Sequence, residues 1–315
     1  MKKLFTILAI IGMAKIATAQ TADDYRGGWR TDGGEPHTYQ FSIRGEQVRG
    51  IYCTRCSDAT TLAFIDGKFT ADGISFVVTH VKADGSTAYK DQATAKFSNG
   101  NLTISGTSGA PGGGKFQRTV IKDPRGPDGL PVAVSRLPPG NGPVPAVGGR
   151  GGGGGGGGAG GAAPAGAPPP RGAGGGGGLG GGYVQPAPWK QLKQSDVIGV
   201  WLGFGSGMNK QFFIIRKVGD QLRGMVCGRC DNPYTMAALD DFEIKGETMT
   251  FNILHEDWGP GTLPFHNQAT VRVAKNEMRL TTQQDNMPPP ANPPGPNAGS
   301  SLMGPIAIEA TIGND

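Results

Sequence analysis

A ten-residue segment occurs twice in this chain and constrains its fold more than any other feature. Residues 47–56 read QVRGIYCTRC and residues 221–230 read QLRGMVCGRC, so that Gln, Arg, Gly, Cys, Arg and Cys recur at the same spacing. The two segments contain all four cysteines of the chain, one Cys-x-x-Cys in each. A repeat at this distance predicts two copies of one module within the 315 residues.

Further matches on both sides of this segment support a duplication. The offset between matched residues grows from 172 at Trp29 and Trp201 to 176 at Gln92 and Gln268, as small loop insertions would produce. The order of the matched blocks is the same in both copies, which indicates one ancestral module. The additional matches are residues 27–29 with 199–201, 76–80 with 251–255, 92–94 with 268–270, and Leu102 and Ile104 with Met278 and Leu280.

The first 19 residues have the pattern of a secretory signal peptide. Lys2 and Lys3 precede an apolar run at 4–13, and Ala-Thr-Ala precedes Gln20. Because the apolar run is too short to span a bilayer, we expect a protein exported to the periplasm or the extracellular space, with no membrane span. Removing the three lysines of this segment lowers the formal charge from +5 to +2, which gives no argument for nucleic acid as a partner.

Residues 24–122 and 196–313 are the two predicted modules. Short alternating runs are separated by dipeptides that favour tight hairpins, such as Asp66-Gly67 and Asn99-Gly100, and no window has a sustained helical period. Seven or eight short antiparallel strands in sequential order favour a small closed β-barrel, with an open sandwich as the alternative. In the second module, Ile306, Ile308, Ala310 and Ile312 alternate as the expected last strand.

Residues 123–190 are predicted to be a disordered linker. This segment contains the glycine runs 151–158 and 174–178 and has almost no apolar side chain to bury. Such a linker would let the modules engage separate sites or two points on one target. The sequence leaves open whether the modules pack together.

The Gly-x-Trp at residues 27–29 and 199–201, followed by the meander, resembles the opening of the calycin β-barrels, the group of lipocalins, fatty-acid-binding proteins and avidin-like proteins. The resemblance implies two up-and-down barrels. It also implies a basic residue on the last strand against the opening Trp, a place that Arg118 would fill in the first module. The second module has Glu309 in that region.

The cysteine pairs Cys53/Cys56 and Cys227/Cys230 allow three interpretations. A redox pair requires its first cysteine at a helix N-terminus, whereas each pair here ends a predicted strand. A metal site requires more ligands than one pair and His80 supply. Export favours a disulfide in each module, which would fix the directions of Arg55 and Arg229. We therefore predict two short-loop disulfides, no metal site and no cofactor.

His80 and His255 each end the inward-facing apolar row of a predicted strand. A neutral histidine at such a position is either a hydrogen-bonded core residue or a polar group in a ligand pocket at the end of the barrel. On the outward face we expect Arg49 and Arg223 to pair with Gln92 and Gln268, each with a modest contribution to stability. The predicted ligand-binding residues are Arg55, His80, Tyr89, Arg229, His255, Trp258 and Phe265.

These features favour an exported, non-catalytic binding protein for a glycan or a small apolar compound. Trp258 beside Glu256 and Asp257 suits a sugar. An alternative is an exported hydrolase or lyase with His80 and His255 as general bases, and a further alternative is a structural envelope protein. The enzyme hypothesis is weakened because the two copies share no acidic residue near these histidines: Asp58, for instance, matches Asn232.

Overall fold

The computed structural model describes residues 20–122, 188–204, 210–230, 232–256, 265–285, 300–306 and 308. The predicted signal peptide, the predicted linker up to residue 187, Trp258 and Glu309 therefore lie outside the described residues. None of the described residues belongs to a helix that is long and apolar enough to cross a membrane.

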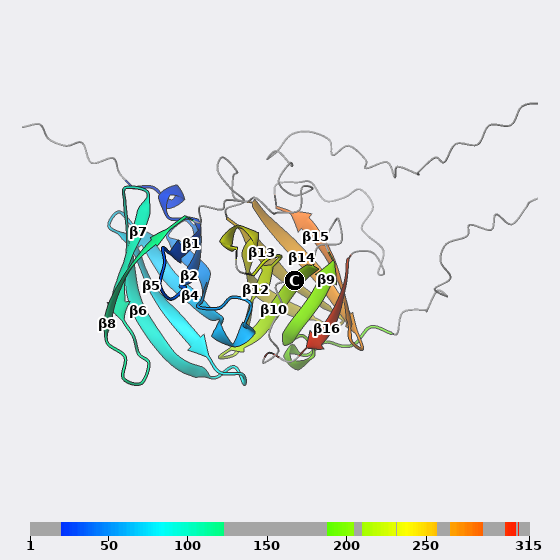
Figure 1. The fold of residues 1–315 in the computed structure, drawn as a ribbon. Coiled ribbons are helices and arrows are strands. Elements are labelled where there is room, and N and C mark those ends of the chain that lie inside the picture. Colours follow the sequence, from blue (N-terminus) through cyan, green and yellow to red (C-terminus); the bar gives the residue numbers. More distant parts are fainter. Residues whose placement is uncertain are drawn as a thin grey trace, which may run out of the picture. The chain divides into compact units, whose positions relative to one another are not determined.

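The first module is a closed antiparallel barrel in which each strand pairs with the next and β8 pairs with β1 (Figure 1). Closure gives every strand two neighbours, although β1 and β8 pair only at Arg30–Ile121 and Thr31–Val120. Its strands are β1 (Gly27–Thr31), β2 (Thr38–Arg44), β3 (Gln47–Cys53), β4 (Ala63–Thr70), β5 (Gly73–Val81), β6 (Thr87–Ser98), β7 (Asn101–Thr107) and β8 (Lys115–Ile121).

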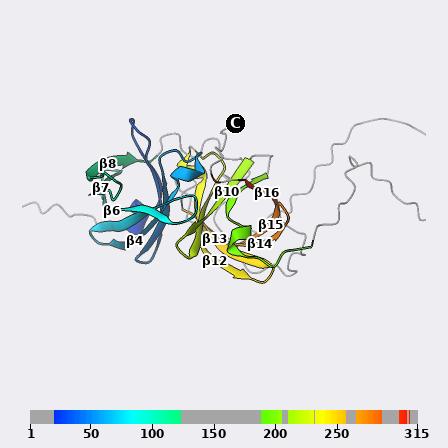
Figure 2. The same cartoon turned by 90° about the horizontal axis from the view of Figure 1, so that it is seen from below.

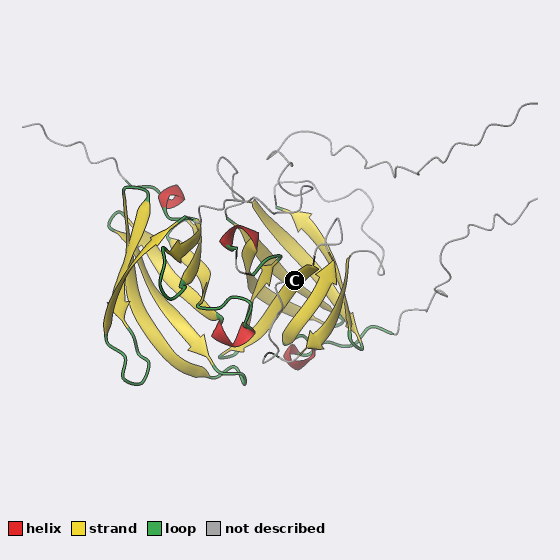
Figure 3. Cartoon of the chain, in the orientation of Figure 1, coloured by secondary structure: helices red, strands yellow, loops and turns green. Residues whose placement is uncertain are grey.

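The second module closes in the same way, with β16 pairing β9, and Figure 2 shows the strands of the barrels from below. The only helical elements among the described residues are short 3₁₀ turns, drawn red in Figure 3. The predicted pair of antiparallel β-barrels is thus confirmed. The strands are β9 (Gly199–Phe204), β10 (Lys210–Val218), β11 (Gln221–Cys227), β12 (Met236–Lys245), β13 (Thr248–His255), β14 (Phe265–Ala274), β15 (Glu277–Gln284) and β16 (Ser300–Ile306).

The closing strand of the second barrel starts earlier than the sequence predicted. β16 pairs with β15 from Ser300 to Met303 and with β9 up to Ile306, whereas the alternation of apolar residues favoured a strand from Ile306 onward. Ala310 and Ile312 lie outside the described residues. The expectation failed because Ser300–Ile306 includes Gly304 and Pro305, which mask its strand character.

The turn between β6 and β7 shows how local sequence sets the strand register. Asn99 has φ +53° and Gly100 has φ +81°. Two consecutive positive φ values are what a two-residue turn of type I′ requires, and Asn-Gly is its preferred sequence. The turn pairs Ser98 with Asn101 and so continues the ladder of the two strands.

The opening tryptophans occupy equivalent places in the two barrel cores. Trp29 and Trp201 are buried, and their indole N–H groups donate to the carbonyls of Tyr25 and Val197 at 2.8 and 2.9 Å. The cation over the Trp29 ring is Lys122, with its Nζ 4.5 Å from the ring centroid. The expected partner Arg118 instead bonds to Tyr39, so this detail of the calycin resemblance was wrong.

A third apolar cluster contains residues of both barrels, which belong to one compact unit of the chain. Ile51 and Phe64 from the outer face of the first barrel join Met225 and Ala238 from the second. All four cysteines lie in this cluster as the predicted disulfides Cys53–Cys56 and Cys227–Cys230. The modules therefore pack together, and the short cystine loops form part of their common interface.

Equivalent charged residues of the two barrels also meet at this interface. The Nη1 atom of Arg223 lies 3.0 Å from Oδ1 of Asp66 in the first barrel. Its Nε atom lies 3.3 Å from Oδ1 of Asp240 in its own barrel. Arg49 likewise contacts both Asp66 and Asp240. The expected pairing of these arginines with glutamines on an open outer surface was wrong, because the outer faces of the neighbouring strands are covered by the other barrel. A sequence pattern cannot distinguish a solvated face from an interface face.

Arg216 on β10 adds a buried charge to the interface. Its guanidinium donates to the carbonyls of Ala59, Leu62, Val81 and Lys82 at 2.7 to 3.2 Å. The residue is 1% exposed. Four carbonyl acceptors thus offset part of the cost of removing the guanidinium from water. This contact ties the second barrel to the chain that directly follows His80.

Candidate functional site

His80 lies at one end of the interior of the first barrel. In the strand ladders it stands opposite Ala63 on one side and Tyr89 on the other, while Val78 stands opposite Asp91. Because side chains alternate along a strand, Val78, His80, Tyr89 and Asp91 all face the inside. The loops that follow β1, β3, β5 and β7 surround this end of the barrel.

Polar and aromatic side chains gather at this end above the apolar core. Their mutual contacts join them into one group, and we call it the polar layer. Tyr39 is 1% exposed, whereas His80, Tyr89 and Arg118 are only partly buried, so the layer extends from the core to solvent. The members of the polar layer are His37, Tyr39, Tyr52, His80, Tyr89, Asp91 and Arg118.

His80 and Asp91 form the charged centre of the polar layer. The Nε2 atom of His80 lies 3.0 Å from Oδ2 of Asp91. The other carboxylate oxygen accepts from the Ser108 hydroxyl at 2.6 Å and from the Gly109 N–H at 3.1 Å. Burial lowers the pKa of His80, and Arg118 lowers it further, against the opposing effect of Asp91. His80 is therefore a neutral imidazole at pH 7, oriented by a fixed carboxylate.

Aromatic rings surround this histidine. The Tyr89 ring stacks on the His80 ring with centroids 4.0 Å apart and planes at 19°. The Tyr52 ring meets the His80 ring edge to face, with their centroids 5.5 Å apart. The Tyr52 hydroxyl lies 2.7 Å from Nδ1 of His37. Burial raises the pKa values of Tyr39 and Tyr52, so both keep their phenolic protons at neutral pH. The layer thus combines flat apolar faces with protonated hydroxyl groups.

Arg118 supplies the positive charge of the polar layer. It stands opposite Ile104 on β7, which places it on the inward face of β8. One guanidinium N–H donates to the Tyr39 hydroxyl at 3.0 Å, and the guanidinium carbon lies 4.2 Å from the centroid of the Phe116 ring. Its charge also contributes to the lowered pKa of His37.

The second barrel has a different set of residues at the same places. Strand pairing makes Phe213 equivalent to Tyr39, Val226 to Tyr52 and Ser300 to Arg118. Asn267 stands opposite Ile253, as Asp91 stands opposite Val78. His255 is retained, and burial, together with the nearby His266, lowers its pKa to about 3. The second barrel therefore keeps the histidine but lacks the phenol and charged groups at these equivalent positions.

The structure separates the predicted ligand residues. His80 and Tyr89 lie together in the polar layer, whereas Arg229 is exposed on the cystine loop of the second barrel. His255 lies at the matching end of that barrel. The backbone of Phe265 belongs to β14, but its side chain and all of Trp258 lie outside what the structure describes.

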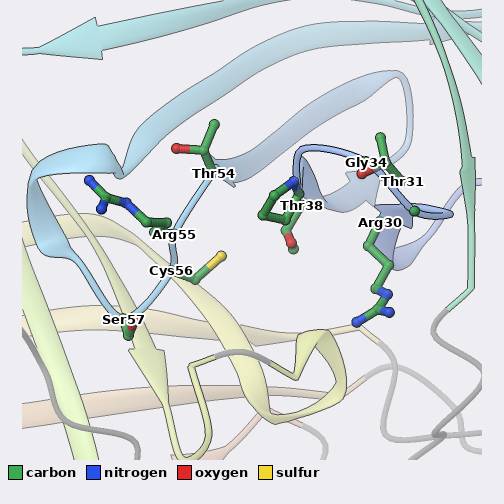
Figure 4. A pocket seen from close by; sticks show the side chains of 10 residues that line it. Arg30, Thr31, Gly34, Thr38, Thr54, Arg55, Cys56 and Ser57 are labelled. Carbon is green, nitrogen blue, oxygen red and sulfur yellow. The ribbon is translucent and has the colours of Figure 1, made fainter.

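Arg55 lines a separate pocket of about 320 Å³ on the first barrel (Figure 4). Arg55 and Arg30 extend in different directions there, and Arg55 pairs with Asp58 at 3.2 Å. Neither histidine belongs to the lining, so the predicted grouping of histidine and arginine in one opening is not present at this pocket. The lining residues are Arg30, Thr31, Gly33, Gly34, Pro36, Thr38, Thr54, Arg55, Cys56 and Ser57.

Sequence reasoning did not identify Tyr39, Tyr52, Asp91 and Arg118 as site residues. The signal for Asp91 was present, because Tyr89, Asp91, Ala93 and Ala95 alternate in the sequence. The predicted strand began at Gln92, however, whereas β6 begins at Thr87. Starting the strand five residues earlier would have placed Asp91 on the same inward face as His80.

Within the described part of the chain, no group of three or more His, Cys, Asp or Glu side chains is arranged to hold a metal ion. Comparisons with protein-family models, with curated proteins and with solved structures each returned no match for this chain.

Proposed function

We propose that this chain is an exported binding protein whose ligand site is the polar layer of the first barrel. The ligand is a small molecule or a glycan unit that inserts its polar groups among Tyr52, His80 and Asp91. The observation that carries the proposal is the concentration of hydroxyl, imidazole and charged groups inside one barrel, where its duplicate has mostly apolar or uncharged residues.

The cost of burying polar groups supports a role in binding. A hydroxyl or a charge inside a protein stabilises the fold poorly unless it is fully hydrogen-bonded. The second barrel closes with Phe213 and Val226 in place of Tyr39 and Tyr52, so the fold does not require the hydroxyl groups. Groups that folding does not need, and that extend toward solvent, are typical of ligand sites.

The second barrel then acts as a support for the site. Arg216 binds the carbonyls of Val81 and Lys82, the two residues after His80. Because β5 ends at Val81, this contact fixes the strand end that carries the imidazole. A site held by neighbouring packed elements loses less entropy when it binds a ligand.

The His80–Asp91 pair also favours a second candidate function, catalysis by general base. A carboxylate that accepts from Nε2 leaves Nδ1 of the neutral imidazole to accept a proton. At the equivalent place of the second barrel, Asn267 stands instead of Asp91. His80 is therefore the general base that this second candidate function names.

The test is a binding screen of the mature full-length chain, since the barrels share an apolar interface cluster and are best kept together. Titration calorimetry against monosaccharides, short glycans and small apolar compounds should identify a ligand. Asp91→Asn, which introduces the residue of the second barrel, should weaken binding roughly tenfold or more. Asp72→Asn, an exposed change in the turn between β4 and β5, is the control and should leave the affinity unchanged.

Equal affinity of the Asp91→Asn variant and the wild type would place the ligand site elsewhere. Conversion of a bound compound, abolished by His80→Gln while binding persists, would favour the enzyme over the binding protein.

A further inference from the structure

The guanidinium of Arg118 is the cation of the polar layer. It donates to the neutral Tyr39 hydroxyl and lies over the Phe116 ring. Among the residues that the structure describes, no carboxylate forms an ion pair with it. A partly buried cation that has only neutral partners is less stable than one paired with an anion.

Asp91, the acid of the same layer, already has hydrogen-bond partners on the protein. Its two oxygens accept from His80, Ser108 and Gly109. These three bonds orient the carboxylate toward β5 and the loop between β7 and β8. The first barrel thus has an anion with three hydrogen-bond partners on the protein and, separately, a cation with unused N–H donors.

We propose that the ligand of the first barrel carries a carboxylate group that pairs with Arg118. This inference depends on the proposed binding function and specifies the chemistry of its ligand. A carboxylate matches the planar guanidinium because both can form two parallel hydrogen bonds. The Tyr39 hydroxyl, which accepts from Arg118, retains its own proton to donate to the same group.

The surroundings would strengthen this ion pair. Tyr39 and Val120 are buried, and Phe116 is partly buried against the core, so the inner side of Arg118 faces apolar material. A charge pair at the boundary of an apolar interior is screened less than one in bulk water. The stacked His80 and Tyr89 rings can hold the rest of the ligand, whether a sugar ring or an apolar chain.

Matched pairs of ligands that differ only in the acid test the inference on the full mature chain. Glucuronate is compared with glucose, and octanoate with octanol, by titration calorimetry at pH 7. The two arms distinguish a sugar acid from an apolar acid as the source of the carboxylate. In the arm that binds, the acid should bind at least tenfold more tightly than its neutral partner.

Arg118→Gln keeps a hydrogen-bonding side chain and removes the charge. It should abolish the preference for the acid over its neutral partner. Arg44→Gln, at the exposed end of β2, removes the same charge from the same barrel and should retain the preference. This control separates a local ion pair from a general effect of net charge.

The outcomes separate the two proposals. Equal affinity for an acid and its neutral partner would overturn the carboxylate inference and leave the binding function intact. A preference that survives in Arg118→Gln would overturn the role of Arg118. Absence of binding in both arms would overturn the inference, and the wider ligand screen would then decide the binding function separately.

Discussion

The two barrels share strand order, register and an inward histidine, but they differ in what surrounds that histidine. His80 contacts Asp91 and two tyrosines in the first barrel. His255 lies in a barrel where Val226 and Asn267 take the places of Tyr52 and Asp91. The difference shows that a buried histidine is compatible with this fold without an acid at the equivalent position. The acid and the hydroxyl groups of the first barrel are therefore the features that call for a functional explanation.

The barrels also contribute unequally to their interface. The equivalent pairs Arg49/Arg223 and Asp66/Asp240 form a nearly symmetric set of contacts. The position of Arg216, however, is occupied by Ser42 in the first barrel, as their places opposite Arg223 and Arg49 show. Ser42 donates to Glu256, which also contacts Arg26 and His266. Arg216 of the second barrel thus binds backbone carbonyls of the first barrel, whereas the equivalent Ser42 of the first barrel binds the buried Glu256 of the second.

The largest expected effect on stability concerns Arg216, whose equivalent in the first barrel is Ser42. Arg216→Met keeps most of the side-chain volume but leaves the carbonyls of Ala59, Leu62, Val81 and Lys82 without these donors. Because buried acceptors without partners are costly, we expect the free energy of unfolding to fall by about 3 kcal/mol or more. Urea denaturation monitored by tryptophan fluorescence measures the change.

The matched change in the first barrel is Ser42→Ala. Glu256 keeps its contacts with Arg26 and His266, so we expect a loss of only about 1 kcal/mol. Equal stability of Arg216→Met and the wild type would contradict the interface between the barrels.

The second effect concerns the two histidines and pH. The pKa of His255 is about 3 in the folded chain, whereas an unfolded histidine has a pKa of about 6.5. Below pH 6.5 the unfolded chain binds a proton that folded His255 does not, so stability falls as the pH decreases from 6.5 toward 3. His255→Gln should reduce the loss of stability between pH 7 and pH 5 by about 2 kcal/mol.

His80→Gln is the comparison for this prediction. Burial lowers the pKa of His80 too, but Asp91 acts in the opposite direction. We therefore expect a smaller change in the pH dependence than for His255→Gln. Urea titrations of both variants at pH 5, 6 and 7 check the order, and a larger effect at His80 would contradict the assignment of the two environments.

The sequence predicted the parts of the fold that depend on local pattern. The duplication, the meander and the disulfides followed from the repeat at Cys53 and Cys227, from alternation and from turn dipeptides such as Asn99-Gly100. Closure of each barrel also followed, because sequential strands of this length leave bare edges in an open sheet. The inward position of His80 was predicted for the same reason, since its row alternates without interruption.

The remaining features depend on which surfaces meet. Arg223 and Arg49 looked like surface residues because they lie on the outward faces of their strands, and in each case the other barrel covers that face. Arg118 was assigned to the opening tryptophan, yet Lys122, beyond the strand end, takes that place. Tyr39 and Tyr52 were not singled out by any sequence motif. Only the strand register shows that they, His80 and Arg118 lie at one end of the barrel.

The smallest expected effect tests the comparison at a single hydroxyl group. Tyr39→Phe gives the first barrel the residue that the second has at this place, Phe213, and removes one acceptor from Arg118. The loss of this hydrogen bond is partly offset because a buried hydroxyl no longer has to leave water, so the free energy of unfolding should change by less than about 1 kcal/mol. The reverse change, Phe213→Tyr, places a buried hydroxyl where the equivalent of Arg118 is Ser300, and should cost more, about 1–3 kcal/mol. Urea denaturation of the two variants side by side measures the order. If Phe213→Tyr were the better tolerated change, the polar layer would not depend on Arg118, and the contrast between the barrels would have to be explained by packing volume instead.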